Sequence, residues 1–216
     1  MAYSAAFFDL DGTILDSMSI WQNLCKNFML KHGIHQEINL EEKLSVISIH
    51  TALECIIDTF KINISLEDAY RETWQIVETF YREKVELKPG IMPILNELKR
   101  KNIPVGIISA TEIELVNEAL KRVGLSDFFT AGVVSCATLE TSKRKPDIFY
   151  AMAEKVGSAP ENTIIFEDAL YAAATAKNAG FALAAVYDPS EKEQEKLAAI
   201  ADYYCRSWEE FPLDEL

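Results

Sequence analysis

The chain has 216 residues and a mass of 24.3 kDa, with 21 Lys and Arg against 34 Asp and Glu, a formal net charge of −13. Hydrophobic residues make up 49% and charged residues 25%, and a chain of this length and composition can bury a full core, which excludes disorder as its main state. The excess of negative charge repels phosphate backbones and anionic lipids, so we expect neither a nucleic-acid-binding nor a membrane-docking protein.

The first predicted element is a buried strand over residues 5–10, which runs directly into an acidic segment. Residues 16–85 then contain three stretches whose apolar side chains recur at helical spacing, with Ser65 as the expected N-cap of the third. These helices interrupt an otherwise regular pattern, so we expect them to form an inserted cap. The chain returns to the regular pattern at Lys88-Pro89-Gly90.

From Lys88 onward, short apolar runs alternate with amphipathic helices. The runs are continuous rather than alternating in polarity, which is typical of parallel strands covered on both faces, and they span residues 104–109, 131–134, 163–166 and 181–187. We expect helices over residues 91–101, 112–123 and 169–179, the second starting at a capping box formed by Thr111 and Glu114 and the third ending at Gly180. The alternation predicts an α/β protein. Its core would be a doubly wound, Rossmann-like parallel sheet of residues 1–15 and 86–216, with an inserted helical-bundle cap over residues 16–85.

Cysteine usage and hydropathy indicate a cytoplasmic protein. The four cysteines are far apart and form no C-x-x-C pair, which predicts buried, reduced thiols rather than disulfides or a zinc site; they are Cys25, Cys55, Cys136 and Cys205. No apolar run approaches the roughly 20 residues of a membrane span, and the N-terminal segment lacks the basic residues of a signal peptide. Nothing in the sequence indicates an obligate protein partner.

The segment Asp9-Leu10-Asp11-Gly12-Thr13 carries the strongest chemical signal. Asp9 and Asp11 are two residues apart, so in an extended chain both carboxylates point to the same side, and Gly12 permits a sharp turn after them. Neighbouring carboxylates repel unless a cation lies between them, and oxygen ligands of this kind suit Mg²⁺. A carboxylate can also attack phosphorus while its neighbour acts as general acid and base. Taken alone, the pattern also fits a plain Asp-Gly turn.

Three further groups follow predicted strands. Ser109 and the backbone N–H of Ala110 could bind phosphate oxygens, Glu167 and Asp168 could complete a cation site, and a lysine of the basic segment 142–147 could stabilise a transferring phosphoryl group. Each has a plainer alternative, namely a turn, a helix N-cap and a solvated lysine. Doubly wound sheets bind ligands at the carboxyl ends of their strands, so the combination predicts one site.

These motifs resemble those of the haloacid dehalogenase-like hydrolases, specifically the β-phosphoglucomutase-like phosphatases with a helical cap. The resemblance extends over nearly the whole chain. It implies that Asp9 is the nucleophile that becomes phosphorylated, and that Asp11 is the acid/base, whose backbone carbonyl also binds Mg²⁺. It further implies Asp168 as a metal ligand, with Glu167 as a second one.

The resemblance also assigns the hydroxyl and the lysine. Ser109 matches the family's second motif and would bind the phosphoryl group together with Gly12 and Ala110. The family lysine lies six residues before the aromatic residue of a Pro-Asp-Ile-Phe segment, here Phe149, which selects Lys143 and ranks Lys145 second. The implied activity is Mg²⁺-dependent hydrolysis of a small phosphomonoester, by family expectation a sugar phosphate, through an aspartyl-phosphate.

Two other functions stay open. A phosphosugar mutase of the β-phosphoglucomutase type would hold the far phosphate with an arginine in the second helix of the cap, and the first arginine of this chain is Arg71, which favours hydrolysis. A phospho-accepting signalling switch or a non-catalytic binding protein is the remaining alternative. The chain length and motif order disfavour the former, and the presence of every catalytic residue type disfavours the latter.

Overall fold

The computed structural model describes residues 3–35 and 49–216. The chain divides into two compact units, which we call the core unit (Met1–Asp16 with Val85–Leu216) and the helical unit (Ser17–Lys84). Residues 36–48 of the predicted cap lie outside the described ranges. Within those ranges, none of the helices combines the length and the hydropathy that a membrane span needs.

The core unit is built on a parallel sheet. Among the described residues, six strands pair in the order β3-β2-β1-β4-β5-β6, and every neighbouring pair is parallel. The strands are β1 (Ala5–Phe8), β2 (Val105–Ser109), β3 (Gly132–Ser135), β4 (Thr163–Glu167), β5 (Ala182–Val186) and β6 (Tyr203–Cys205). The predicted α/β fold with a doubly wound parallel sheet is confirmed. β6 is the strand that we did not predict, because its three residues form no apolar run of their own.

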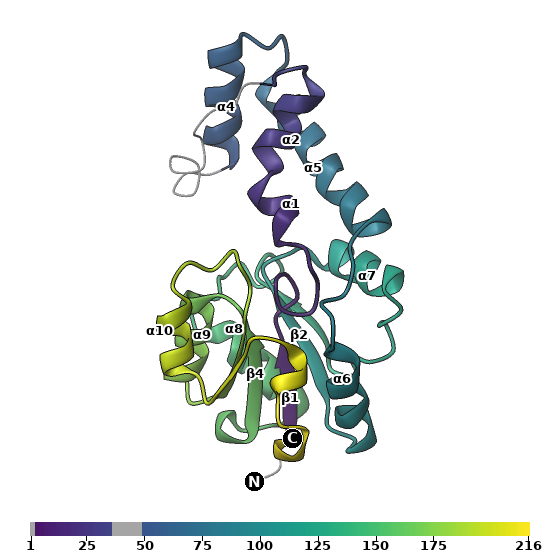
Figure 1. Ribbon diagram of the computed structural model, residues 1–216, viewed down its shortest axis with the longest axis vertical. Coiled ribbons are helices and arrows are strands. Elements are labelled where there is room, and N and C mark those ends of the chain that lie inside the picture. Colours follow the sequence, from purple (N-terminus) through teal and green to yellow (C-terminus); the bar gives the residue numbers. More distant parts are fainter. Residues whose placement is uncertain (1–2, 36–48) are drawn as a thin grey trace. The chain divides into compact units, whose positions relative to one another are not determined.

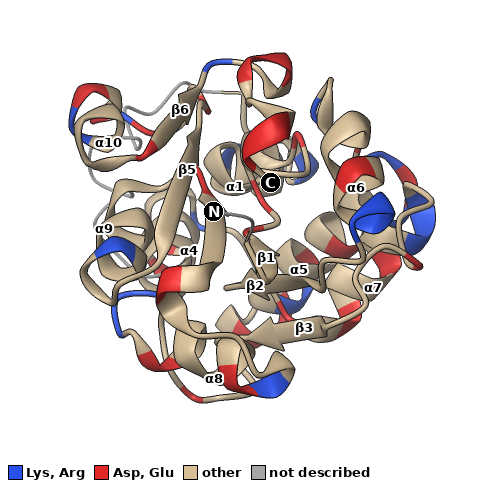
Figure 2. Cartoon of the chain, turned by 90° about the horizontal axis from the view of Figure 1, so that it is seen from below, with Lys and Arg blue, Asp and Glu red and all other residues tan. Residues whose placement is uncertain are grey.

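Helices cover both faces of this sheet (Figures 1 and 2). The helices of the core unit are α6 (Ile91–Arg100), α7 (Ile113–Arg122), α8 (Asp147–Val156), α9 (Leu170–Asn178) and α10 (Gln194–Ile200). α8, α9 and α10 lie against one face, and α6 and α7 lie against the other. In β1, Phe7 belongs to the buried cluster that includes Phe149 of α8. The ring of Phe8 instead packs near Trp208, with 6.1 Å between the two ring centroids. Successive residues of a central strand thus enter two different apolar layers, which explains why its sequence is continuously apolar.

The capping box predicted at the start of α7 is wrong, although the helix lies where it was expected. The N-cap of this helix is Glu112, which makes no side-chain capping hydrogen bond. The Thr111 hydroxyl donates instead to the Asp11 carboxylate. A long-range partner has therefore displaced the local capping interaction that the sequence favoured.

The helical unit contains α1 (Met18–Gln22), α2 (Leu24–Lys31), α4 (Ile49–Phe60) and α5 (Leu66–Glu83) (Figure 1). The first predicted helix is divided into α1 and α2 at Asn23. The expected cap of α5 is confirmed, because the side chain of Ser65 accepts a hydrogen bond from the Asp68 N–H at 3.1 Å. A buried apolar cluster joins α2, α4 and α5, with Phe28 and Leu53 fully buried.

All four cysteines are free thiols, as predicted, but not all are buried. Cys136 and Cys205 are buried, Cys25 is half-buried and Cys55 is exposed. The expectation of burial is therefore wrong for Cys55, which follows Glu54 on the outer face of α4 while Leu53 and Ile56 face the apolar cluster.

The chain leaves and re-enters the core unit at adjacent points. Leu15 and Leu87 form an antiparallel bridge. The Asp16 N–H donates to the Glu86 carbonyl at 3.0 Å, and the Lys88 N–H donates to the Ile14 carbonyl at 2.8 Å. The helical unit is thus inserted between two backbone segments that are hydrogen-bonded to each other.

Candidate active site

Asp9 lies directly after the central strand β1. Its backbone N–H donates to the Phe166 carbonyl of β4 at 2.9 Å, which continues the strand pairing one residue beyond β1. The residue is 6% exposed. A rigid, buried backbone therefore presents this carboxylate at the carboxyl edge of the sheet, where α/β proteins bind their ligands.

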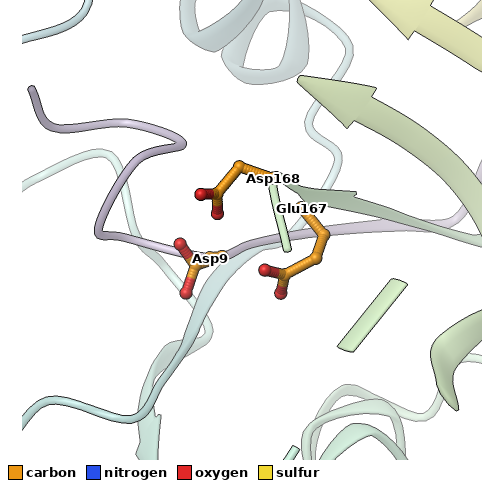
Figure 3. A group of neighbouring side chains, drawn as sticks. All are labelled: Asp9, Glu167 and Asp168. Atoms are coloured by element: carbon orange, nitrogen blue, oxygen red, sulfur yellow. The ribbon is translucent and has the colours of Figure 1, made fainter. Parts of the chain in front are cut away.

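Asp9 is grouped with two acids at the end of β4, its last residue Glu167 and the next residue Asp168. Figure 3 shows the carboxyl groups of Asp9, Glu167 and Asp168 turned toward one another. One carboxylate oxygen from each lies within 4.8 Å of the others, and all three residues are buried. The neighbouring strands β1 and β4 thus supply a compact carboxylate cluster, here defined as Asp9, Glu167 and Asp168.

Lys143 supplies a positive charge to the carboxylate cluster. Its ammonium contacts Asp9 Oδ1 and donates to Glu167 Oε2 at 2.8 Å, and the residue is 3% exposed. Lys145, the second choice for this position, is exposed. The structure therefore brings Lys143 and not Lys145 against Asp9.

One ammonium does not balance three buried carboxylates. Burial raises the pKa of Asp9 to about 7, with the opposing attraction of Lys143 outweighed and with Glu167 and Asp11 raising it further. Burial, followed by the charges of Asp9 and Glu167, also raises the pKa of Asp168 well above its ordinary value. For Lys143, burial disfavours the charged form, but the attraction of Asp9 and Glu167 is stronger and raises its pKa. The site is short of positive charge.

The carboxylate cluster fits a divalent cation. Asp9 Oδ2 is buried and has no hydrogen-bond partner within the described part of the chain. Asp168 Oδ1 accepts from the Thr13 hydroxyl at 3.1 Å, which fixes the orientation of that carboxylate. Glu167 is more fully engaged, since Oε2 accepts from Lys143 and Oε1 accepts from the Ala169 N–H at 3.2 Å. Carboxylate oxygens are the ligands that Mg²⁺ prefers, so these residues match the expected metal.

A second group of site residues gathers on the β2 side of Asp9. Ser109, the last residue of β2, is fully buried, and its Oγ accepts from the Thr111 N–H at 3.0 Å. The Thr111 hydroxyl donates to Asp11 Oδ2 at 2.6 Å. The Asp11 side chain is therefore linked to Ser109 through Thr111, whereas the other acids near Asp9, Glu167 and Asp168, come from the end of β4.

The remaining predicted residues shape the turn and the rim of the site. Gly12 has φ of +85°, in the region that only glycine enters freely, and this turn directs the chain away from the strand after Asp11. Ala110 is exposed beside the buried Ser109. Their expected contacts with a phosphoryl group stay predictions.

Two residues of the site were not singled out from the sequence. Thr13 was visible within the first acidic motif, but nothing local indicated a bond to Asp168, 155 residues away. Thr111 had a signal that pointed elsewhere, because its spacing to Glu114 matches a capping box.

Comparisons with known proteins agree with this geometry. The family model described as haloacid dehalogenase-like hydrolase matches residues 6–186. The phosphorylated carbohydrates phosphatase of Thermotoga maritima is 23% identical over 176 residues, 82% of this chain and 81% of the relative. The β-phosphoglucomutase of Bacillus subtilis is 29% identical over 185 residues, 82% of this chain and 80% of the relative.

The fold is shared with solved structures. The crystal structure of a candidate β-phosphoglucomutase from Thermotoga maritima superposes with a TM-score of 0.83 at 22% identity, covering 97% of this chain and 96% of that one. At this identity, the structural likeness establishes the fold, and the family model together with the curated relatives establishes the family. The chain therefore belongs to the haloacid dehalogenase-like hydrolases, in their β-phosphoglucomutase-like group of phosphatases, as its motifs predict.

Proposed function

We propose that the chain is a Mg²⁺-dependent phosphatase that hydrolyses a small phosphomonoester, a sugar or polyol phosphate, through a phosphoryl-Asp9 intermediate. The observation that carries the proposal is the buried carboxylate Asp9, held against Lys143 while Oδ2 has no partner in the described part of the chain. A buried carboxylate oxygen without a hydrogen bond lowers the stability of the folded state. Its presence therefore indicates that the oxygen has a function. Attack on phosphorus and binding of a cation are two such functions.

In the proposed reaction, Asp9 attacks phosphorus in line with the leaving oxygen, and the P–O bond to the alcohol breaks as the bond to Asp9 forms. Asp11 gives its proton to the departing oxygen and then takes a proton from the water that attacks phosphoryl-Asp9. Lys143 and Ser109 interact with the phosphoryl oxygens.

Mg²⁺ would be held by Asp9, Asp168 and the backbone carbonyl of Asp11, with Glu167 as a further candidate ligand. Its charge would offset the repulsion between the carboxylates and the incoming phosphate. The contact between Glu167 and Lys143 supports a second role for Glu167, that of orienting the lysine.

The helical unit is proposed to act as the cap of this enzyme. A cap that closes over the site excludes bulk water during phosphoryl transfer and presents side chains that select the substrate. The carbohydrate phosphates named for the Thermotoga relative support a sugar phosphate as the substrate class. The net charge of −13 supports a small metabolite rather than a nucleic acid as the partner. A cytoplasmic location also stays a prediction.

The test is phosphate release from a panel of sugar phosphates, polyol phosphates, nucleotides and 4-nitrophenyl phosphate, with Mg²⁺ or with chelator. We expect release that requires Mg²⁺, and that Asp9→Asn reduces by at least about 10³-fold because it removes the nucleophile. Release that persists at the wild-type rate in Asp9→Asn would show that the nucleophile is assigned wrongly.

A matched pair of lysine variants tests the proposed role of the Lys143 ammonium. Lys143→Ala should lose activity by about 10²-fold or more, because the ammonium contacts Asp9 directly. Lys145→Ala, two residues away and exposed, should keep activity within about threefold. Equal losses in the two variants would contradict the assignment of Lys143.

A phosphosugar mutase is the second candidate, favoured by the 29% identity to the Bacillus β-phosphoglucomutase. The two functions differ in the group that accepts the phosphoryl group from Asp9, a water molecule or a sugar hydroxyl. Interconversion of glucose 1-phosphate and glucose 6-phosphate faster than phosphate release would favour the mutase over the phosphatase.

A further inference from the structure

Thr111 contacts both chemical groups on the β2 side of the site. It is 6% exposed and lies two residues after the end of β2. Its N–H donates to Ser109 Oγ, and its hydroxyl donates to Asp11 Oδ2 at 2.6 Å. A threonine at this point could have capped α7, yet its hydroxyl is turned toward an acid 100 residues earlier in the chain.

This hydrogen bond is strong and well anchored. A hydroxyl that donates to a carboxylate at such a distance forms a charge-assisted hydrogen bond, which is about twice as strong as a neutral one. The β-branched side chain of threonine is stiff about χ1. Because the Thr111 backbone is itself bonded to Ser109 at the end of a central strand, the hydroxyl is a fixed point for Asp11.

The direction of this contact matters for the chemistry. β1 lies between β2 and β4 in the sheet. Thr111, which holds the Asp11 carboxylate, follows β2, whereas Glu167 and Asp168 lie at the end of β4. A fourth carboxylate among those of the cluster would add repulsion and would be bound by the cation rather than exchange protons. On the β2 side, Asp11 instead lies with Ser109, the expected ligand of the phosphoryl oxygens.

We propose that Thr111 is a positioning residue for the acid/base Asp11, a role that rests on the proposed phosphatase function. In the first half-reaction, the proton of Asp11 moves to the leaving oxygen as its bond to phosphorus breaks, which leaves Asp11 as a carboxylate. The Thr111 hydroxyl stabilises and orients that carboxylate until it takes a proton from the attacking water, whose oxygen bonds to phosphorus as the Asp9–phosphorus bond breaks. Protons and bonds balance over the two halves, and no other reactant is required.

The proposal predicts selective damage when the hydroxyl is removed. A 4-nitrophenolate leaving group departs without help from an acid, whereas a phenolate leaves far more readily when it is protonated. Loss of a positioned Asp11 should therefore slow phosphorylation of Asp9 by phenyl phosphate much more than by 4-nitrophenyl phosphate. The two esters are nearly identical in shape, so a change in substrate binding would affect both.

The experiment compares Thr111→Val, which keeps the shape and removes the hydroxyl, with Thr111→Ser, which keeps the hydroxyl. For Thr111→Val, we expect kcat/KM to fall by about 10- to 100-fold with phenyl phosphate and by less than about threefold with 4-nitrophenyl phosphate. Thr111→Ser should stay within about threefold of the wild type with both substrates. Equal losses with the two esters, or no loss with either, would overturn the positioning role.

Two further measurements separate positioning from a merely structural effect. Water attack on phosphoryl-Asp9 still needs Asp11, so Thr111→Val should show a burst of 4-nitrophenolate followed by slow turnover. In an Asp11→Asn background, Thr111→Val should cause no further loss with phenyl phosphate, since the group that it positions is gone. An additional loss in that background would contradict the proposal.

The outcomes distinguish this inference from the proposed function. If the wild-type chain releases no phosphate from either ester, both fail together. If the wild type is active and Asp9→Asn is inactive, while Thr111→Val behaves as the wild type, only the positioning role fails. Thermal unfolding followed by circular dichroism establishes that each variant is folded, and should Thr111→Val not fold, Thr111→Ala compared with Thr111→Ser gives the same test.

Discussion

At the scale of single residues, the proposed nucleophile Asp9 lies where its own charge is unfavourable for folding. The pKa of Asp9 is raised from 3.8 to about 7, chiefly by burial, which means that the folded state disfavours the ionised carboxylate. A reactive, poorly solvated anion is what attack on phosphorus requires. The ionised form of Asp9 is therefore expected to lower the free energy of unfolding, while the same burial keeps the carboxylate poorly solvated and reactive toward phosphorus.

The first prediction concerns the loss of folding stability that the ionised, buried Asp9 causes. With chelator present at pH 8, Asp9→Asn should raise the free energy of unfolding by about 1–3 kcal/mol, or about 2–4 °C in Tm for each kcal/mol. At this pH, Asp9 is ionised in both the folded and the unfolded state, so the full penalty is present in the wild type. Below about pH 4, Asp9 is protonated in both states and the advantage of the variant should vanish.

The measurement is thermal unfolding of the wild type and Asp9→Asn between pH 4 and pH 8. The stability of the wild type relative to the variant should fall as the pH rises from about 4 to about 7, the interval between the two pKa values. Asp127→Asn, at an exposed acid of the core unit, is the matched control and should change little. A destabilised Asp9→Asn at pH 8 would show that the attraction to Lys143 outweighs burial.

At the scale of secondary-structure elements, the site depends on where strands end and on how closely the chain packs behind them. Gly90 is the N-cap of α6 and has φ of +88°, and a Cβ there would lie 2.6 Å from Glu209 Oε1 and 3.0 Å from Trp208 Cβ. Trp208 in turn packs against Phe8 and Phe166 of the strands that carry the site. The turn at Gly90 thus requires glycine both for its backbone and for the close approach.

The second prediction compares Gly90→Ala with Gly124→Ala. Gly124 has φ of +72° but no atom within 4 Å of a built Cβ, so its substitution should cost only the backbone strain, about 1–2 kcal/mol. Gly90→Ala should cost roughly 1–2 kcal/mol more, because the alanine methyl would lie 3.0 Å from the Cβ of the buried Trp208, whereas the exposed Glu209 side chain can move aside. Urea unfolding of both variants measures the difference, and equal destabilisation would mean that the neighbours of Gly90 yield without cost.

At the scale of the whole molecule, the chain interrupts one folded unit with another. The two segments that connect the units are hydrogen-bonded to each other, Asp16 to Glu86 and Lys88 to Ile14. The sheet and its covering helices are otherwise formed within the core unit. This arrangement indicates that the core unit can fold without the helical unit.

The third prediction is the replacement of residues 17–84 by a short Gly-Ser linker. We expect the shortened chain to unfold cooperatively and to hydrolyse 4-nitrophenyl phosphate, because the proposed catalytic residues all lie in the core unit. The kcat/KM for a sugar phosphate should fall by about 10-fold or more, since the proposed cap excludes water and selects the substrate. Loss of cooperative unfolding would contradict independent folding, and unchanged kinetics with sugar phosphates would contradict the role of the cap.

The sequence by itself determined the layers of the fold and the positions of the chemical groups along the chain. Continuous apolar runs are typical of strands buried on both faces, and a glycine after Asp-x-Asp favours a turn at the strand end, which places the acids at the edge of the sheet. The edge strand β6 and the division of the first helix at Asn23 escaped prediction because neither leaves a strong periodic signal.

Only the tertiary structure decided which of these groups meet. Asp9 and Lys143 are 134 residues apart, and Asp11 and Thr111 are 100 residues apart, so no local pattern relates them. Thr111 is an example, because it binds Asp11 where the local sequence predicted that it would cap α7. In a cap, the Thr111 oxygen would accept from a helix N–H, whereas in the structure its hydroxyl donates to a carboxylate that the pairing of β1 with β2 brings close, and a hydrogen bond to a carboxylate is stronger than a neutral one.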